Sequence, residues 1–202
     1  MTEHDAYYEA QQAYKDGDLP KCLSILESTA AENDDDCRAF LGSLYLEGEG
    51  VPKDTQRAIS ILKTAAERTN KTATYLLGIT YLWGKGVPEN KDLGIRYLKR
   101  AALMNFVEAQ FVLGGALIEQ CSGVFRKKGP VNESIAWVLV AAQNGHHDAS
   151  KNLNNLKKEP PKPAVELANN IYGAIQSLQM LSSLDPDTAL TRLAELEQEE
   201  WS

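Results

Sequence analysis

Apolar residues recur along the chain at four-residue steps, and the whole pattern recurs every 36 residues. It begins with a small side chain, continues with leucine four residues later, and ends with tyrosine or leucine after four more. Three copies follow it: Cys37, Leu41 and Tyr45; Ala73, Leu77 and Tyr81; and Ala109, Leu113 and Leu117. Because residues four apart share one face of an α-helix, each copy predicts a helix with one buried face.

A pair of adjacent alanines marks a second helix in each copy. The pairs are Ala65-Ala66, Ala101-Ala102 and Ala141-Ala142. The first two pairs are 36 residues apart and the last two are 40 apart, so about four residues are inserted in the third copy. The insertion falls within Cys121–Pro130. We interpret it either as a specific contact or as drift in a tolerant loop.

A nearly repeated turn lies between the two landmarks, GEGVPKD at residues 48–54 and GKGVPEN at residues 84–90. Glycines permit positive φ and end one helix, and proline prevents its continuation. The final Asp or Asn can then cap the next helix. Each copy therefore predicts a helix, a glycine-rich turn and a second helix. In the third copy the turn is rewritten as KKGPVNES.

Weaker copies with the same spacing flank the three clear ones: Ala6, Ala10 and Tyr14 at the start, and Ala149 and Leu153 near the end. Terminal copies of a stacked array differ from inner copies because one of their faces meets water. We therefore expect one solenoid over residues 1–158, with about four repeats and a closing helix.

The repeat pattern stops at EPPKP, residues 159–163, which no helix can cross. We expect residues 159–202 to form a separate C-terminal helical cap or tail. Apolar spacing predicts one helix over residues 164–184 and a second over about 188–200, before Trp201. Two interpretations stay open: the first tail helix caps the array, or the last one docks on a partner or on a second copy.

The combination A-x-x-x-L-G-x-x-Y, then G-x-G-V-P-x-D, then A-A, resembles the Sel-1-like repeat family, a relative of tetratricopeptide repeats. In the second copy its members are Ala73, Leu77, Gly78, Tyr81, Gly84, Gly86, Val87, Pro88 and Ala101-Ala102. The resemblance implies an all-α fold, a right-handed α/α superhelical solenoid of antiparallel helix pairs. It also implies a role as an adaptor or scaffold for proteins or peptides, without a common enzymatic activity. Some bacterial members are linked to signalling, secretion and immunity to secreted toxins.

The composition is that of an ordinary folded protein, with 202 residues of which 43% are hydrophobic and 24% charged. With 21 basic and 28 acidic residues the net charge is -7, and the one small basic cluster, residues 126–128, is too short to follow a phosphate backbone. We expect no nucleic-acid partner. The N-terminus lacks a secretory signal and no stretch is apolar enough to span a bilayer, so we expect a cytoplasmic protein without membrane attachment.

No arrangement of side chains predicts catalysis, a cofactor or a metal. The three cysteines, Cys22, Cys37 and Cys121, share no ligand spacing, and we interpret them as small buried residues. His146-His147-Asp148 suggests a metal at first sight, but further ligands at suitable spacing are missing and the segment sits in the turn before a first helix. Asp34-Asp35-Asp36 is interpreted as a helix cap. We expect a chain that is not an enzyme and binds no cofactor.

The first helix of each repeat in such a solenoid lines its concave face. Residues of these helices that the landmarks do not use are therefore expected to face the groove. They predict an apolar, aromatic strip rimmed by acids: Tyr75, Ile79, Trp83 and Phe111, with Glu47 and Glu119. Such a strip is typical of an interface hot spot, and the acids favour a basic partner. The alternative is that these residues pack on the neighbouring repeat as core.

The pattern therefore predicts a non-catalytic adaptor or scaffold of a bacterial-type cell that binds a partner protein or peptide in its concave groove. A narrower alternative is an immunity or chaperone protein that neutralises a secreted effector or toxin, because a small acidic chain captures basic proteins rapidly. An enzyme comes third, since no nucleophile, base and orienting acid can be assembled. The oligomeric state stays open.

Overall fold

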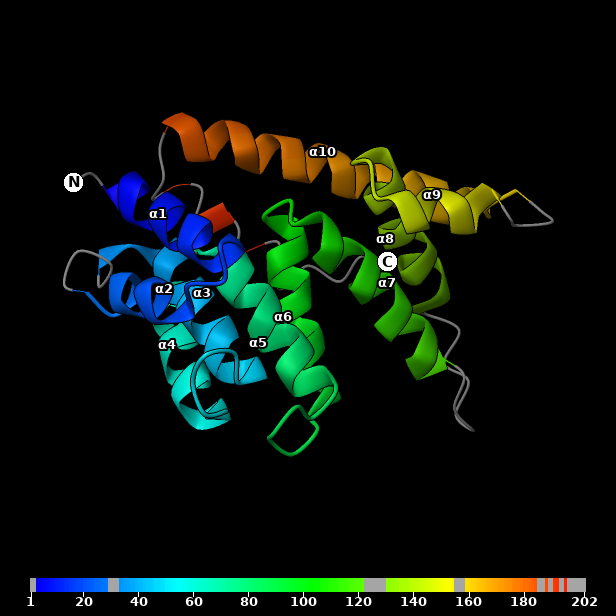
Figure 1. The fold of residues 1–202 in the computed structure, drawn as a ribbon. Coiled ribbons are helices and arrows are strands. Elements are labelled where there is room, and N and C mark those ends of the chain that lie inside the picture. Colours follow the sequence, from blue (N-terminus) through cyan, green and yellow to red (C-terminus); the bar gives the residue numbers. More distant parts are fainter. Residues whose placement is uncertain are drawn as a thin grey trace. The chain divides into compact units, whose positions relative to one another are not determined.

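The computed structural model describes residues 3–28, 33–121, 130–154 and 159–184, with single positions at 188, 191, 192 and 195. These residues contain ten helices and no strand (Figure 1). In chain order the helices are α1 (Glu3–Lys15), α2 (Leu19–Leu26), α3 (Asp35–Glu47), α4 (Thr55–Glu67), α5 (Lys71–Leu82), α6 (Lys91–Leu103), α7 (Val107–Cys121), α8 (Pro130–Gln143), α9 (His147–Asn154) and α10 (Lys162–Leu184). The predicted all-α class is confirmed.

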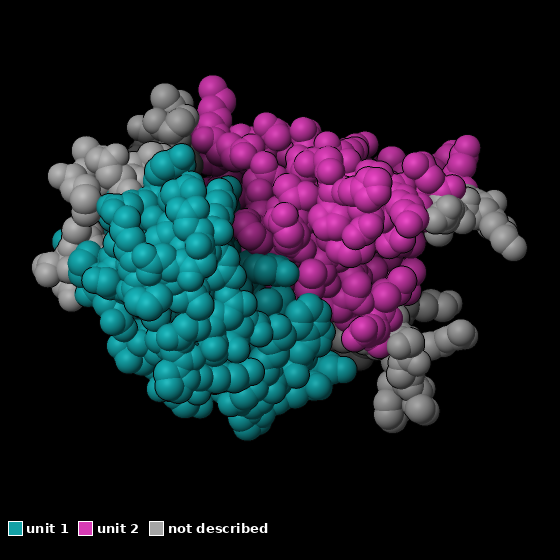
Figure 2. Space-filling model, viewed as in Figure 1, with its two compact units in different colours: residues 1–94 teal, residues 95–202 magenta. Residues whose placement is uncertain are grey.

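The chain divides into two compact units, residues 1–94 and residues 95–202 (Figure 2). Unit 1 holds α1 to α5 and the start of α6, and unit 2 holds the rest of α6 and α7 to α10. The domain boundary expected between residues 158 and 159 stays a prediction.

Consecutive helices of unit 1 pack as pairs, α1 on α2 and α3 on α4. In addition α3 contacts both α1 and α5, so the first helices of successive repeats are neighbours. The landmark side chains lie in the core between them: Cys37, Leu41, Tyr45, Ala73 and Leu77 are all buried. The predicted buried face of the first helices is therefore confirmed at these positions, whereas Tyr81 is half-buried and Tyr14 of α1 is 38% exposed.

Polar side chains at a fixed spacing begin the helices of unit 1. Asp18, Asp54 and Asn90 follow one another at 36-residue steps, and each accepts a hydrogen bond from the backbone N–H three residues later. Asp34 and Asn70 cap α3 and α5 in the same way. Such a cap satisfies an N–H that the helix leaves unpaired, and replacing it with alanine costs about 1 kcal/mol.

The glycine-rich turns also bring each repeat onto the repeat before it. The second glycines of the two turns, Gly50 and Gly86, both have a φ of +73°, which residues with side chains rarely adopt. A Cβ on Gly50 would lie 3.1 Å from the Cβ of Leu19, and a Cβ on Gly86 would meet Oγ1 of Thr55. Leu19 and Thr55 begin α2 and α4, the second helices of the preceding repeats. Conformation and contact therefore both require glycine at this position.

First and second helices approach closely where small residues meet. A Cβ on Gly42, in the Leu-Gly landmark of α3, would lie 2.6 Å from side-chain atoms of Leu62 in α4. On α6, a Cβ on Gly94 would lie 2.6 Å from the backbone nitrogen of Leu82 and 2.9 Å from the carbonyl oxygen of Gly78. At Gly94 the two helix backbones are therefore almost in contact, and no side chain fits between them.

Unit 2 is organised around α8, which contacts α7, α9 and α10. Ser134 of α8 donates a buried hydrogen bond of 2.7 Å to the carbonyl oxygen of Gly114, the third copy of the Leu-Gly landmark. The side chain of Trp137 on the same helix is fully buried. The third repeat thus keeps the close contact between its helices despite the insertion that separates them in sequence.

The first tail helix is α10, as the apolar spacing over residues 164–184 predicts. Its buried residues form one stripe at helical spacing: Ala164, Leu167, Ala168, Ile171, Ile175 and Leu178. Because α10 packs on α8, its position favours the capping interpretation over a free tail. The second predicted tail helix and the inserted segment between Cys121 and Pro130 lie largely outside the described residues.

Replacing Gly94 with alanine should lower the free energy of unfolding by about 1–3 kcal/mol, because the new methyl group meets backbone atoms that cannot move aside. Gly173→Ala on α10 is the matched control. Nothing lies within 4 Å of a Cβ at Gly173, so alanine should stabilise the helix there by about 0.5–1 kcal/mol. Urea denaturation followed by circular dichroism measures both, and equal effects would contradict the close approach.

Candidate partner-binding surface

The six predicted partner-binding residues are divided between the two units. Glu47, Tyr75, Ile79 and Trp83 belong to unit 1, and Phe111 and Glu119 to unit 2. Glu47 is the last residue of α3, and Trp83 directly follows α5, where its backbone N–H donates to the carbonyl oxygen of Ile79 at 3.2 Å. The side chain of Trp83 is 51% exposed, which leaves a large apolar ring in contact with water.

Lys85, which the helical spacing does not predict as a site residue, connects Glu47 with Trp83. Its Nζ lies 3.3 Å from Oε1 of Glu47 and 5.8 Å from the centroid of the Trp83 ring. A cation at this distance from an indole face is attracted by the negative charge density of the ring. The structure therefore brings these three side chains together, and we call Glu47, Trp83 and Lys85 the Trp83 surface.

The 36-residue period contains the signal that could have found Lys85. Lys85 is the middle residue of the second G-x-G turn, and Glu49 is its equivalent in the first. Glu49 accepts a hydrogen bond from the hydroxyl of Tyr14 near the end of α1, and this bond raises the pKa of Tyr14. In both turns the middle residue thus reaches back to the end of the preceding repeat's first helix.

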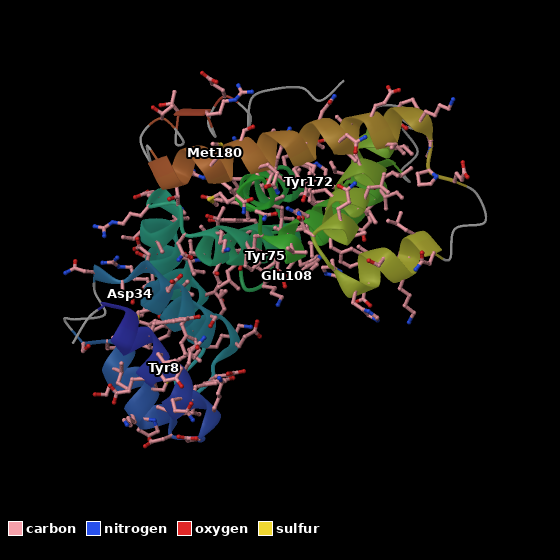
Figure 3. The ribbon with its side chains drawn as sticks, turned by 90° about the horizontal axis from the view of Figure 1, so that it is seen from above. Tyr8, Asp34, Tyr75, Glu108, Tyr172 and Met180 are labelled. Atoms are coloured by element: carbon pink, nitrogen blue, oxygen red, sulfur yellow. The ribbon has the colours of Figure 1, made fainter. Side chains whose placement is uncertain are left out.

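The rest of the predicted strip in unit 1 is less accessible. Ile79 is only 8% exposed, and Tyr75 is half-buried. First helices of neighbouring repeats pack directly on one another, so a position expected to face the groove can face the next helix instead. Another exposed tyrosine, Tyr8 of α1, does not extend this strip: it is 67% exposed but lies well apart from Tyr75 (Figure 3). Ile79 therefore offers little surface to a partner.

Phe111 of unit 2 packs within its own unit. Its ring is half-buried and stacks on the ring of His146, with centroids 4.3 Å apart and planes 24° apart. Nδ1 of His146 accepts a hydrogen bond of 3.3 Å from the backbone N–H of Ala149 and so caps α9. Phe111 thus links α7 to the start of α9, whereas Glu119 is exposed near the end of α7, beside Ile118, which is 50% exposed.

Three polar side chains of unit 2, one of them fully buried, form a hydrogen-bonded cluster. Gln110 is fully buried, and its Nε2 donates to the carbonyl oxygen of Ala102 and to Oδ1 of Asn105, both at 3.1 Å. Nδ2 of Asn144 donates to Oε1 of Gln110 and to Oδ1 of Asn105, both at 2.9 Å. Because these groups satisfy one another's hydrogen bonds, the cluster is a structural network.

The titratable side chains of the described ranges bear on metal binding and on thiol chemistry. Within those ranges, no group of three or more His, Cys, Asp or Glu could hold a metal ion. Cys22 and Cys37 are free and buried, and burial raises the pKa of Cys22 and raises that of Cys37 to about 12. None of the helices in this part of the chain combines the length and apolar composition that a membrane crossing needs.

Comparison with known proteins identifies the repeat. The family model described as Sel1 repeat matches residues 36–70 and 72–106. Among solved structures, the crystal structure of a Sel1 repeat protein from Oxalobacter formigenes superposes with a TM-score of 0.65 and 22% sequence identity. The alignment covers 95% of this chain and 82% of that one, so it supports the solenoid fold over nearly all of this chain. The curated proteins include no match.

Trp83→Ala and Phe111→Ala should differ in their cost to stability. Trp83 is half exposed, so its loss should change the free energy of unfolding by less than about 1 kcal/mol. Loss of Phe111 removes the stack on His146 and should cost about 2 kcal/mol. Urea denaturation of the two variants provides the comparison. A Trp83→Ala variant as unstable as Phe111→Ala would place the indole in the core.

The thiols of Cys22 and Cys37 should resist alkylation in the folded protein. A pKa of about 12 leaves ~10⁻⁴ of the Cys37 thiol as reactive thiolate at pH 8, and burial blocks access to both sulfur atoms. In a Cys121→Ser background, iodoacetamide should modify both residues only after urea unfolds the chain, as measured by mass spectrometry. Rapid modification without urea would show that the α2–α3 packing opens readily.

Proposed function

We propose that this chain is an adaptor or scaffold that binds a partner through the Trp83 surface, because residues 36–70 and 72–106 match the Sel1 repeat and Sel1 repeats are generally protein-interaction modules. Sel1 repeats are typically non-catalytic, which agrees with a binding role. The cytoplasmic location and the narrower immunity or chaperone role stay predictions.

One observation carries the proposal: an indole that is 51% exposed stands at the end of a helix whose neighbouring positions are buried. Leu82 is 4% exposed and Ile79 is 8% exposed on the same helix. A large aromatic ring gains most when a partner covers it, and tryptophan is among the residues most often found at the energetic centre of interfaces. Trp83 is therefore the anchor residue of the proposed interface.

The charges around Trp83 supply the polar rim that such an anchor needs. Glu47 and Lys85 remain 54% and 39% exposed at the side-chain level, so both can exchange water for partner groups at low cost. The whole chain carries a net charge of -7, which speeds the approach of a basic protein. A basic partner is therefore part of the proposal. Tyr75, Phe111 and Glu119 stay predicted contacts.

An affinity capture with matched variants tests this function. Tagged wild-type protein, Trp83→Ala and Met180→Ala would be incubated with lysate of the native cells, and captured proteins identified by mass spectrometry. Met180 is the control because it is 67% exposed on α10, in the other unit. We expect one stoichiometric partner with the wild type and with Met180→Ala, and its loss with Trp83→Ala.

Calorimetry with the purified partner should then give at least about tenfold weaker binding for Trp83→Ala, the loss typical of a hot-spot residue. A partner that Trp83→Ala retains at full affinity would move the interface away from the Trp83 surface.

A further inference from the structure

Lys85 holds its ammonium group between a carboxylate and an indole ring. The ammonium lies 3.3 Å from a carboxylate oxygen of Glu47 and 5.8 Å from the centroid of the Trp83 ring. A carboxylate and the face of an indole are two groups that attract cations at protein interfaces. All three side chains belong to unit 1 and are substantially exposed, so a group arriving from solvent can reach them.

The turn does not need a cation at this position. The backbone N–H of Lys85 donates to the carbonyl oxygen of Thr80 at 3.0 Å, and Glu49 makes the same bond with Leu44 in the preceding turn, also at 3.0 Å. The same backbone therefore forms with an acid or with a base in the middle of the turn. What distinguishes Lys85 is the pair of groups that its side chain meets.

The contacts that hold Lys85 are weak enough to be exchanged. An exposed ion pair gains little, because water solvates both charges and two long side chains must be ordered. Removing such a pair changes an equilibrium by at most about fivefold. A partner that brings a better cation can displace the ammonium, which then returns to water on its flexible stem.

We propose that Lys85 is an internal substitute for an arginine of the partner, and that this arginine takes its place between Glu47 and Trp83 in the complex. The proposal rests on the proposed function, because it assumes that the partner docks on the Trp83 surface. Arginine fits better than lysine, because its planar guanidinium can lie flat on the indole while two parallel N–H groups bind one carboxylate.

Two capped pentapeptides test the exchange, one with a central arginine between glycines and one with citrulline, the uncharged analogue, at the same position. The full-length protein labelled with ¹⁵N reports binding through the indole N–H signal of Trp83, which the spectrum of Trp83→Phe assigns. We expect the arginine peptide to shift this signal saturably and the citrulline peptide to leave it in place.

Lys85→Met keeps the length of the side chain and removes the competing charge, so it should tighten arginine-peptide binding by about two- to fivefold. Glu47→Gln removes the carboxylate charge and should weaken the binding. Lys53→Met is the matched control, because Lys53 is another exposed lysine of unit 1 and its loss changes the net charge equally. It should leave the affinity within about 1.5-fold, since general attraction is screened by salt.

Equal tightening by Lys85→Met and Lys53→Met would overturn the proposal, since net charge would then explain the effect. Weaker or unchanged binding with Lys85→Met would also overturn it. A native partner that is lost with Trp83→Ala while the arginine peptide fails to shift the indole signal would refute the exchange and leave the proposed function standing. Native-partner binding that is unchanged in Trp83→Ala would refute the proposed function and, with it, the partner arginine at this site, even if Lys85→Met binds the arginine peptide more tightly.

Discussion

The close approach of first and second helices at small residues is the constraint on which each repeat depends. At Gly94 the neighbouring atoms are the backbone nitrogen of Leu82 and the carbonyl oxygen of Gly78, so no side chain can be added without separating two helices. In unit 2 the same kind of contact is made by Ser134, whose hydroxyl binds the carbonyl oxygen of Gly114. Small residues that bring helix axes close leave the larger leucines and tyrosines to fill the space on either side.

This contact between the two helices restricts the length and the residues of the turn that joins them. Once the pair is fixed, the chain must reverse within a few residues, and the second glycine of the turn is pressed against the first residue of the preceding second helix. The turn is therefore also a contact between repeats, and the fold requires glycine at both of these positions. The residue between them has its backbone fixed by a hydrogen bond, but its side chain is not needed for packing. It can vary, as Glu49 and Lys85 do.

The sequence predicts those parts of the structure that are local and periodic. Helix faces, caps such as Asp54 and the glycines of the turns follow from chemistry within a few residues, and they repeat, so each copy supports the others. Ile79 and Phe111 depend instead on how one repeat packs on the next, which helical spacing does not encode. Nothing in the sequence around Lys85 distinguishes it from an ordinary loop residue, and only the structure shows its contacts with Glu47 and Trp83.

In a solenoid of this kind, a partner can be distinguished only by residues that the repeat does not use for itself. The last positions of the first helices and the middle of the turn meet this condition, because the helix pair is already fixed by the small-residue contact and the glycines. Ordering an exposed indole costs little entropy because it has only two side-chain torsions. The charge of a neighbouring side chain can then differ from repeat to repeat without loss of stability, since exposed charges contribute little to folding. The proposed partner-binding surface accordingly lies where a first helix ends and its turn begins, at Trp83, Glu47 and Lys85.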